Sequence, residues 1–275
     1  TIANPVANPI VTTTYTLTAT NTASGCTATD TVIVTVDSAL PVANAGADFT
    51  KTCTTNATGS TIGATAVAGL TYAWTPATGL SDATVANPTA NPTATTTYTV
   101  EVTNTATGCT ATDTVVVTVD LTAPVANAGT DFTKTCTTNA TGLEIGATAV
   151  AGVTYAWTPA TGLSSATVAN PIANPTTTTT YTVTATNTAS GCSATDTVVV
   201  TVDTNLPVAN AGTDFTKTCV TNPTGLEIGA TAVAGVTYAW TPATGLSDAT
   251  VANPTANPTA TTTYTVTATN TASGC

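Results

Sequence analysis

The sequence repeats itself with a period of about 83 residues, and this period constrains the fold more than any other feature. The three Trp, the three Phe and the three Lys all recur at this spacing: Trp74, Trp157 and Trp240; Phe49, Phe132 and Phe215; Lys51, Lys134 and Lys217. The seven cysteines form two series with the same period: Cys26, Cys109, Cys192 and Cys275 follow a Gly, and Cys53, Cys136 and Cys219 end a TKTC segment. We therefore expect a tandem array of equivalent units rather than one large domain.

The sequence opens and closes inside a unit. Its first ten residues, TIANPVANPI, match the segment TVANPTANPT at 84–93, and Cys275 stands where earlier units continue with a segment such as TATDTVVVTVD. We expect a window from a longer array. The expected organisation is the C-terminal part of a repeat at 1–37, complete repeats at 38–120 and 121–203, and a repeat at 204–275 that lacks its last strand.

The pattern within one unit predicts an all-β fold, because apolar residues alternate with period two. Strands are expected over 70–76, 95–104 and 112–120, as the C, F and G strands of a sandwich, with an A strand in 41–52 and a B strand in 60–68. The Asn-Pro pairs of 85–93 predict a loop. No segment predicts a helix.

A Trp on the third strand and a Tyr near the start of the sixth are typical of immunoglobulin-like sandwiches. Such a Tyr can donate a hydrogen bond to the backbone upstream. The sequence thus predicts tandem immunoglobulin-like (PKD-like) β-sandwiches in an end-to-end rod. The expected core aromatics are Trp74, Trp157, Trp240, Tyr98, Tyr181 and Tyr264.

Composition excludes several classes of function. Charged residues make up 6% of the chain, with no His, no Arg and a net charge of -11. No Ser-His or Cys-His pair can form, so we expect no enzyme and no resident cofactor. Three scattered lysines cannot bind nucleic acid. No apolar run approaches the roughly 20 residues of a membrane span, so no membrane insertion is expected.

Three segments of the first complete repeat resemble a known family: PVANAGADFTKTC, YAWTPATGLSDATVANPTANPTATTTYTVEVTN and GCTATDTVVVTVD. They are similar to the PKD-like and immunoglobulin-like tandem repeats of giant Bacteroidota surface proteins, a group that includes SprB-like adhesins and other type IX secretion cargo. The resemblance implies an exported, extracellular or cell-surface protein of stalk-like shape. Many PKD modules carry a WDFGDG-type segment where this chain has WTPATGL, so no carboxylate-dependent role of that segment is carried over.

Two functions from different classes follow. The first is a structural region of an extracellular stalk, filament or adhesin that mediates surface or cell contact. The alternative is an array of glycan- or protein-binding modules, which the small number of aromatic residues disfavours. Because so little charge separates identical surfaces, we also expect lateral self-association into a homo-oligomer or filament. A surface or cell target would be bound by regions outside this sequence.

Two cysteines at fixed positions in every unit are typical of an exported, oxidised protein. The Gly-Cys cysteine falls in the F–G turn and the TKTC cysteine at the end of strand A, so strand direction places the two at opposite poles of one unit. We therefore favour bridges between neighbouring units, from Cys53 to Cys192 and from Cys136 to Cys275. Cys26 and Cys219 would then pair with units outside the sequence. The alternative is bridging within a unit, Cys53 to Cys109 and Cys136 to Cys192.

Other side chains suggest weaker hypotheses. Aspartates flank each junction and could hold calcium, but turn-forming roles are favoured: Asp37 and Asp48, Asp120 and Asp131, Asp203 and Asp214. The single Lys of each unit could form an isopeptide bond, although an exposed edge lysine is favoured. Two sequons, at Asn56 and Asn139, are interpreted as turns. Asp-Thr-Val triplets resemble the Bacteroidota O-glycosylation signal at Thr31, Thr114 and Thr197.

Overall fold

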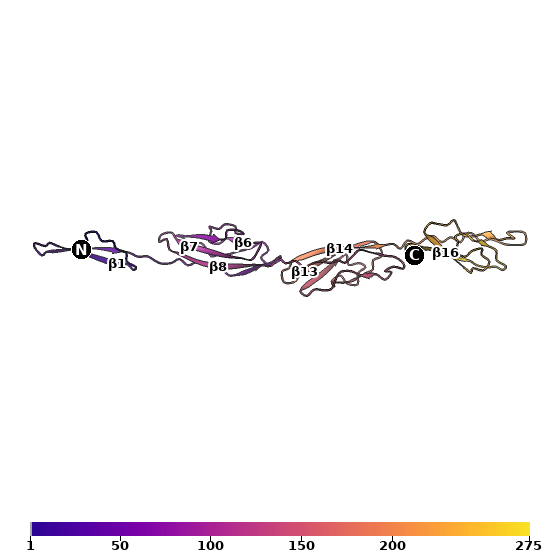
Figure 1. The fold of residues 1–275 in the computed structure, drawn as a ribbon, viewed down its shortest axis with the longest axis horizontal. Coiled ribbons are helices and arrows are strands. Elements are labelled where there is room, and N and C mark those ends of the chain that lie inside the picture. The colour runs from indigo at the N-terminus through magenta and orange to yellow at the C-terminus, as the bar shows by residue number, and fades with distance from the viewer. Residues whose placement is uncertain (1) are drawn as a thin grey trace. The chain divides into compact units, whose positions relative to one another are not determined.

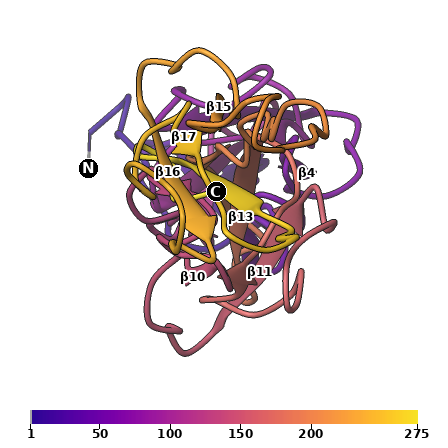
Figure 2. The same ribbon diagram turned by 90° about the vertical axis from the view of Figure 1, so that its right-hand side faces the viewer.

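The computed structural model describes residues 2–275, and all regular elements among them are β-strands (Figure 1). The view along the other axis likewise contains arrows and loops only (Figure 2). Within residues 2–275 no helix could span a membrane. The chain divides into two compact units, the first ending at Thr122 and the second running from Ala123 to Cys275. The all-β prediction is confirmed.

Residues before the first complete repeat form a hairpin, and that repeat itself forms two sheets. The hairpin is β1 (Thr13–Thr20) with β2 (Thr27–Val34). One sheet of the repeat has four strands in the order β3-β8-β7-β5, and the other pairs β4 with β6. Their bounds are β3 (Phe49–Lys51), β4 (Ser60–Thr61), β5 (Leu70–Thr75), β6 (Thr89–Ala90), β7 (Thr96–Asn104) and β8 (Thr110–Val119). Strand β3 runs parallel to β8, and the other pairs are antiparallel.

The second complete repeat has the same topology, with sheet orders β11-β13-β14-β9 and β10-β12. Its strands are β9 (Phe132–Lys134), β10 (Leu143–Glu144), β11 (Val153–Thr158), β12 (Ile172–Ala173), β13 (Thr179–Asn187) and β14 (Ser193–Val202). The third repeat pairs β15 with β17 and β16 with β18. Its strands are β15 (Leu226–Glu227), β16 (Val236–Thr241), β17 (Thr255–Ala256) and β18 (Thr265–Asn270). Two facing sheets with this strand order make each complete repeat an immunoglobulin-like sandwich.

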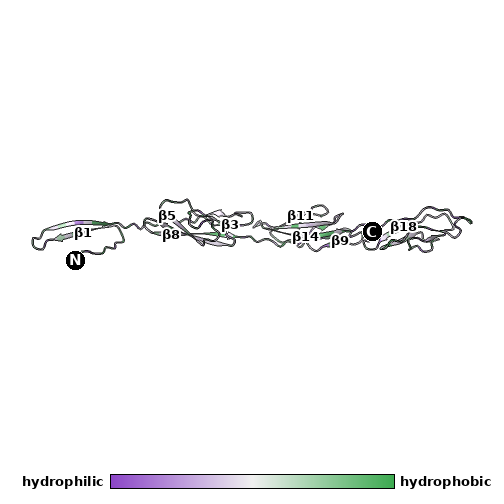
Figure 3. Cartoon of the chain, turned by 90° about the horizontal axis from the view of Figure 1, so that it is seen from above, coloured by the Kyte–Doolittle hydropathy of each residue, from purple (hydrophilic) through white to green (hydrophobic). Residues whose placement is uncertain are grey.

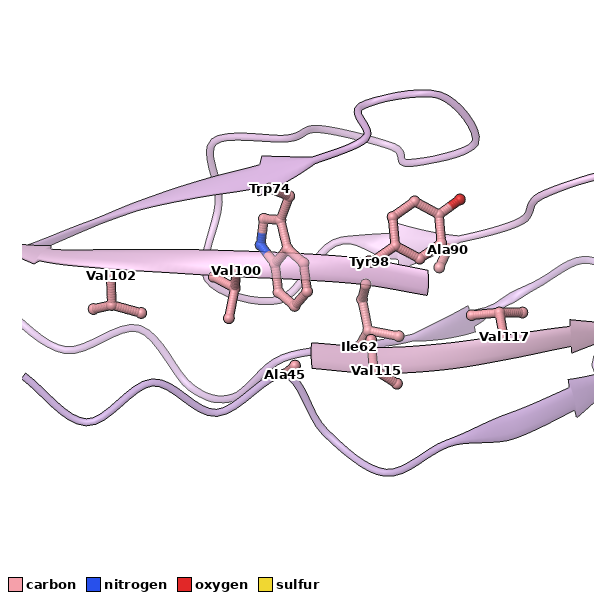
Figure 4. Close-up of a cluster of buried hydrophobic side chains, with 9 residues drawn as sticks. All are labelled: Ala45, Ile62, Trp74, Ala90, Tyr98, Val100, Val102, Val115 and Val117. Carbon is pink, nitrogen blue, oxygen red and sulfur yellow. The ribbon is translucent and has the colours of Figure 1, made fainter. Parts of the chain in front are cut away.

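The core lies between the two sheets and follows the predicted alternation. Tyr98, Val100 and Val102 on β7 are 0–1% exposed, while the residues between them face outward or lie half-buried. Figure 4 shows these side chains gathered with Trp74 from β5 and with Ile62, which directly follows β4. Buried apolar area of this kind supplies most of the free energy of folding. The predicted core Trp residues are all buried: Trp74, Trp157 and Trp240.

The core tyrosines behave as expected in the complete repeats and differ in the third. Tyr181 is buried like Tyr98, but Tyr264 is only half-buried. Strand β14 covers the β13 edge in the second repeat, whereas β18 has no equivalent neighbour within residues 2–275. Phe215 likewise lies outside any strand, because residues 2–275 include no equivalent of β14, on which β9 pairs in the second repeat. The expected core role of Tyr264 is therefore only partly correct.

The predicted A and B strands are much shorter than expected, with three residues in β3 and two in β4. Side chains replace ladder hydrogen bonds before β3: the Asp113 carboxylate accepts from Ala45 N at 2.8 Å, and Asp48 accepts from Val116 N at 2.8 Å. The Asn-Pro loop also contains strand β6. A carboxylate on one strand can accept a hydrogen bond from a neighbouring segment that lacks regular strand geometry. The alternation of residues does not predict such a contact.

Thr and Ala dominate the surface. Figure 3 is mostly white, with green restricted to short stretches such as those on β8 and β14. Valines of β8 and β14 occupy core positions on these long strands, while other large apolar residues, such as Val42, Val125 and Val208, are exposed.

Candidate functional site: the junction between repeats

Strand register separates the two cysteines of one repeat. Strand β9 runs parallel to β14, with Phe132 opposite Val200 and Lys134 opposite Val202. Cys136 follows β9 and lies beyond the C-terminal end of β14, whereas Cys192 directly precedes the first residue of β14. A strand of this length spans roughly 33 Å at about 3.3 Å per residue. A disulfide allows roughly 4.4–6.8 Å between Cα atoms, so these two cysteines cannot pair.

The first complete repeat has the same arrangement. Lys51 lies opposite Val119 at the C-terminal end of β8, so Cys53 is at one end of the sheet, and Cys109 precedes β8 at the other. Cys53 is disulfide-bonded, while Cys109 carries a free thiol. The alternative of bridges within a repeat is therefore wrong for this fold.

A disulfide joins Cys136 to Cys275, with their Cα atoms 5.0 Å apart. It connects the end of β9 in the second repeat to the turn that follows β18 in the third, across 139 residues of sequence. This is one of the two pairs that strand direction favours. Cys192, like Cys53, is disulfide-bonded. Cys26 and Cys219 carry free thiols here, and their pairing with repeats outside the sequence stays a prediction.

The turn that carries Cys275 packs closely on the second repeat. The Thr137 hydroxyl lies 3.4 Å from the Ser273 carbonyl oxygen and donates to it, and Ser273 is fully buried. Gly274 adopts a φ of +70°, and a Cβ at this position would lie 2.5 Å from the Thr137 side chain. Gly274 therefore serves both turn geometry and close packing at this junction, whereas a Cβ at the equivalent Gly25 or Gly108 would meet nothing within 4 Å among residues 2–275.

The same turn is closed by its own hydrogen bonds. Asn270 N donates to the Cys275 carbonyl at 2.8 Å, Gly274 N donates to the Asn270 carbonyl at 2.8 Å, and Ala272 N donates to Asn270 Oδ1 at 2.9 Å. The corresponding bonds occur at Asn21, where Cys26 carries a free thiol. The turn is thus preformed without a disulfide. Sequence reasoning missed Thr137 and Asn270, although the recurring hexapeptide pattern N-T-A-x-G-C was a usable signal.

The junction aspartates accept hydrogen bonds from backbone amides. Asp131 accepts from Val199 N at 2.8 Å, and Asp120 accepts from Thr122 N at 3.1 Å. On β14, the bonds from Ala128 N and then Thr197 N lower the pKa of Asp196. Within residues 2–275 no three potential metal ligands gather. The Asp120 contact matches the favoured turn-forming role, whereas Asp131 holds its own segment to β14, 68 residues away. Calcium binding at a junction stays a hypothesis.

The lysine of the first complete repeat is buried. Lys51 is 7% exposed, and its ammonium donates to the Asn91 side-chain oxygen and, at 2.8 Å, to the Pro92 carbonyl. Lys134 and Lys217 make the equivalent bond to a proline carbonyl at 2.9 and 3.1 Å. The expectation of an exposed edge lysine is wrong for Lys51. Its ammonium fastens the end of strand A to the loop after β6, because buried carbonyl oxygens need a donor.

The predicted sequon asparagines are turn residues. Asn56 and Asn139 have φ of 48° and 50°, and each side-chain amide donates at 2.9 Å to a carbonyl six residues upstream. The nitrogen that a glycan would use is therefore engaged. The threonines of the Asp-Thr-Val triplets are exposed, and their modification stays a prediction: Thr31, Thr114 and Thr197.

No protein-family model and no curated protein matches this chain. Solved structures do match. A three-immunoglobulin-domain fragment of titin is 11% identical, with a TM-score of 0.38 over 83% of this chain and 92% of its own. Immunoglobulin domains 1–5 of Sidekick-1 are 15% identical, with a TM-score of 0.30 over 95% of this chain and 64% of their own.

A third match is a SusE-like, surface-located polysaccharide-binding protein from Bacteroides thetaiotaomicron. It is 14% identical, with a TM-score of 0.31 over 70% of this chain and 40% of its own. None of these scores reaches 0.5, so the assignment of the immunoglobulin-like fold stands on the strand order within each repeat.

Proposed function

We propose that this chain is the structural repeat region of an extracellular stalk, filament or adhesin, of the kind found in SprB-like Bacteroidota surface proteins exported by type IX secretion. The observation that carries the proposal is the disulfide from Cys136 to Cys275, which joins two successive repeats. Disulfides persist in oxidising, extracellular compartments. The sequence has no His and no Arg, so general acid–base chemistry would have to rest on its carboxylates, Cys, Tyr and three Lys.

The proposal extends this bridge to every junction. The equivalents of Cys136 and Cys275 one repeat nearer the N-terminus are Cys53 and Cys192. Both Cys53 and Cys192 are disulfide-bonded. Cys26 and Cys219 would then pair with repeats outside the sequence. We call this series of bridges the disulfide ladder. It would restrict bending wherever repeats 38–120, 121–203 and 204–275 follow one another, as a stalk requires.

Peptide mapping under non-reducing conditions tests the ladder. We expect linked peptides for Cys53 with Cys192 and for Cys136 with Cys275, in protein released from intact cells by external protease. Linked peptides that contain Cys53 with Cys109, or protein that external protease cannot reach, would contradict the proposal.

The alternative, a glycan- or protein-binding module array, has less support. Trp74, Trp157 and Trp240 are 2–4% exposed, so the residues best suited to stack on a sugar lie in the core. Binding of the purified chain to a glycan array would favour this alternative.

We also propose lateral self-association of the array. Each linker exposes a valine at the same place in the repeat, with exposed fractions of 83, 88 and 85% at Val42, Val125 and Val208. Weak apolar contacts of this kind add up when they recur along a chain. Analytical ultracentrifugation should show concentration-dependent association, and a strictly monomeric chain at high concentration would refute it.

A further inference from the structure

We infer that the junction disulfides make a short segment of each repeat pair the path of tension and leave most of the second repeat outside it. The inference deepens the proposed stalk function and rests on it. The starting observation is that Cys109 and Cys136 are consecutive cysteines that flank one linker, while the bridge from Cys136 to Cys275 skips 139 residues.

The shortest covalent route from Cys109 to Cys275 runs through this segment. It follows β8 out of the first complete repeat, crosses the linker, follows β9 into the second, and passes through the disulfide to Cys275. The polypeptide route between the same two residues follows every residue from 109 to 275 and is several times longer. Tension applied at the two points is borne by the shorter route once the slack in that route is used up.

The short route has little slack. Strand β8 comprises ten of its residues and is already extended. A β-strand rises about 3.3 Å per residue, and a fully stretched chain reaches about 3.3–3.6 Å per residue. The segment from Cys109 to Cys136, roughly 27 residues, therefore reaches about 90–97 Å at most. The bridge adds 5.0 Å between Cα atoms.

Most of the core of the second repeat lies off this route, although the route carries Ala128 and Phe132 of that core. Trp157 and Tyr181 belong to the stretch between Cys136 and Cys192, which the bridge bypasses. Within that repeat β9 is hydrogen-bonded in parallel to β14, and β14 begins the next equivalent segment, from Cys192 to Cys219. Two successive tension-carrying segments therefore lie side by side in one sheet. In a ladder, each segment would span two repeats.

Single-molecule stretching of the full chain tests the inference. One handle is attached at the Cys109 thiol, in a background of Cys26→Ser and Cys219→Ser, and the other at the C-terminus. We expect the oxidised chain to stop extending at about 100 Å, and the same chain in dithiothreitol to reach about 550–600 Å. Oxidised molecules that extend beyond about 100 Å, although mapping finds the Cys136–Cys275 link, would overturn the inference.

A matched control separates this inference from the ladder as a whole. The variant that adds Cys136→Ser and Cys275→Ser loses the short route, so it should extend far beyond the parent chain in oxidising buffer. Its limit is about 460–505 Å if Cys53 is bridged to Cys192, and about 550–600 Å if it is not. The longer limit would refute the ladder of the proposed function, but it would not contradict the inference about the Cys136–Cys275 bridge. A control that still stopped near the parent's limit would refute the assigned route.

Discussion

Replacing Tyr181 with Phe isolates one hydrogen bond of the sandwich core. The Tyr181 hydroxyl donates to the Thr161 carbonyl at 2.8 Å, and its ring is fully buried. Phe keeps the ring and removes only the donor. The Thr161 carbonyl then loses its partner, which costs about 1–2 kcal/mol.

Hydrogen exchange followed by mass spectrometry measures this loss of stability as a faster exchange of backbone amides in peptides from β13 of the oxidised chain. A change of about 1–2 kcal/mol corresponds to exchange roughly 5–30 times faster where opening is at equilibrium. Unfolding of the whole chain is less informative, because several repeats contribute to it.

Tyr155→Phe is the matched control in the same repeat. The Tyr155 hydroxyl accepts from Val150 N at 3.0 Å, but its ring is half-buried, whereas the Tyr181 ring is fully buried. Water can replace this acceptor, so the change should stay within about 0.5 kcal/mol. Equal effects of the two substitutions would refute the reasoning that burial makes the Tyr181 bond important.

Three further predictions concern the second repeat. Burial raises the pKa of Tyr181. This residue therefore contributes stability at pH values below the ordinary tyrosine pKa of 10.0, and the contribution is lost as the pH rises through the higher folded-state pKa. Alkaline unfolding followed by circular dichroism should show a smaller pH dependence in Tyr181→Phe. The lowered pKa of Asp196 contributes stability that is present above pH 3.8 and is lost as the pH falls through the folded-state pKa. Asp196→Asn should therefore make stability depend less on pH in the acid range. Gly146→Ala should unfold the repeat at lower denaturant concentration than Gly152→Ala, because both have positive φ but only the first would place Cβ 2.1 Å from the Ala169 carbonyl; equal midpoints would contradict this.

The long strands could be predicted from sequence because their alternation is local. Tyr98, Val100 and Val102 alternate with polar residues along β7, and any strand with this pattern buries one face. The direction of the strands also follows from the sandwich topology, which is why opposite poles for Cys136 and Cys192 could be inferred before the register was known.

The short strands and the junction depended on contacts between segments far apart in sequence. Strand β3 is short because Asp113, 68 residues beyond Ala45, supplies the bond that a longer strand would have made. Lys51 is buried because Asn91 and Pro92 return beside it from across the sandwich. Local alternation carries no information about such partners, since their proximity is created only when the sheets pack.

The repeat period by itself determined that the chain is an array of equivalent units and that its cysteines form two series. The tertiary structure decided how close members of the two series come. Cys136 and Cys275 meet only because the turn after β18 packs on Thr137, and the absence of a side chain at Gly274 allows that approach. Periodicity specifies which residues are equivalent, whereas the contact between neighbouring repeats depends on the shape of both surfaces.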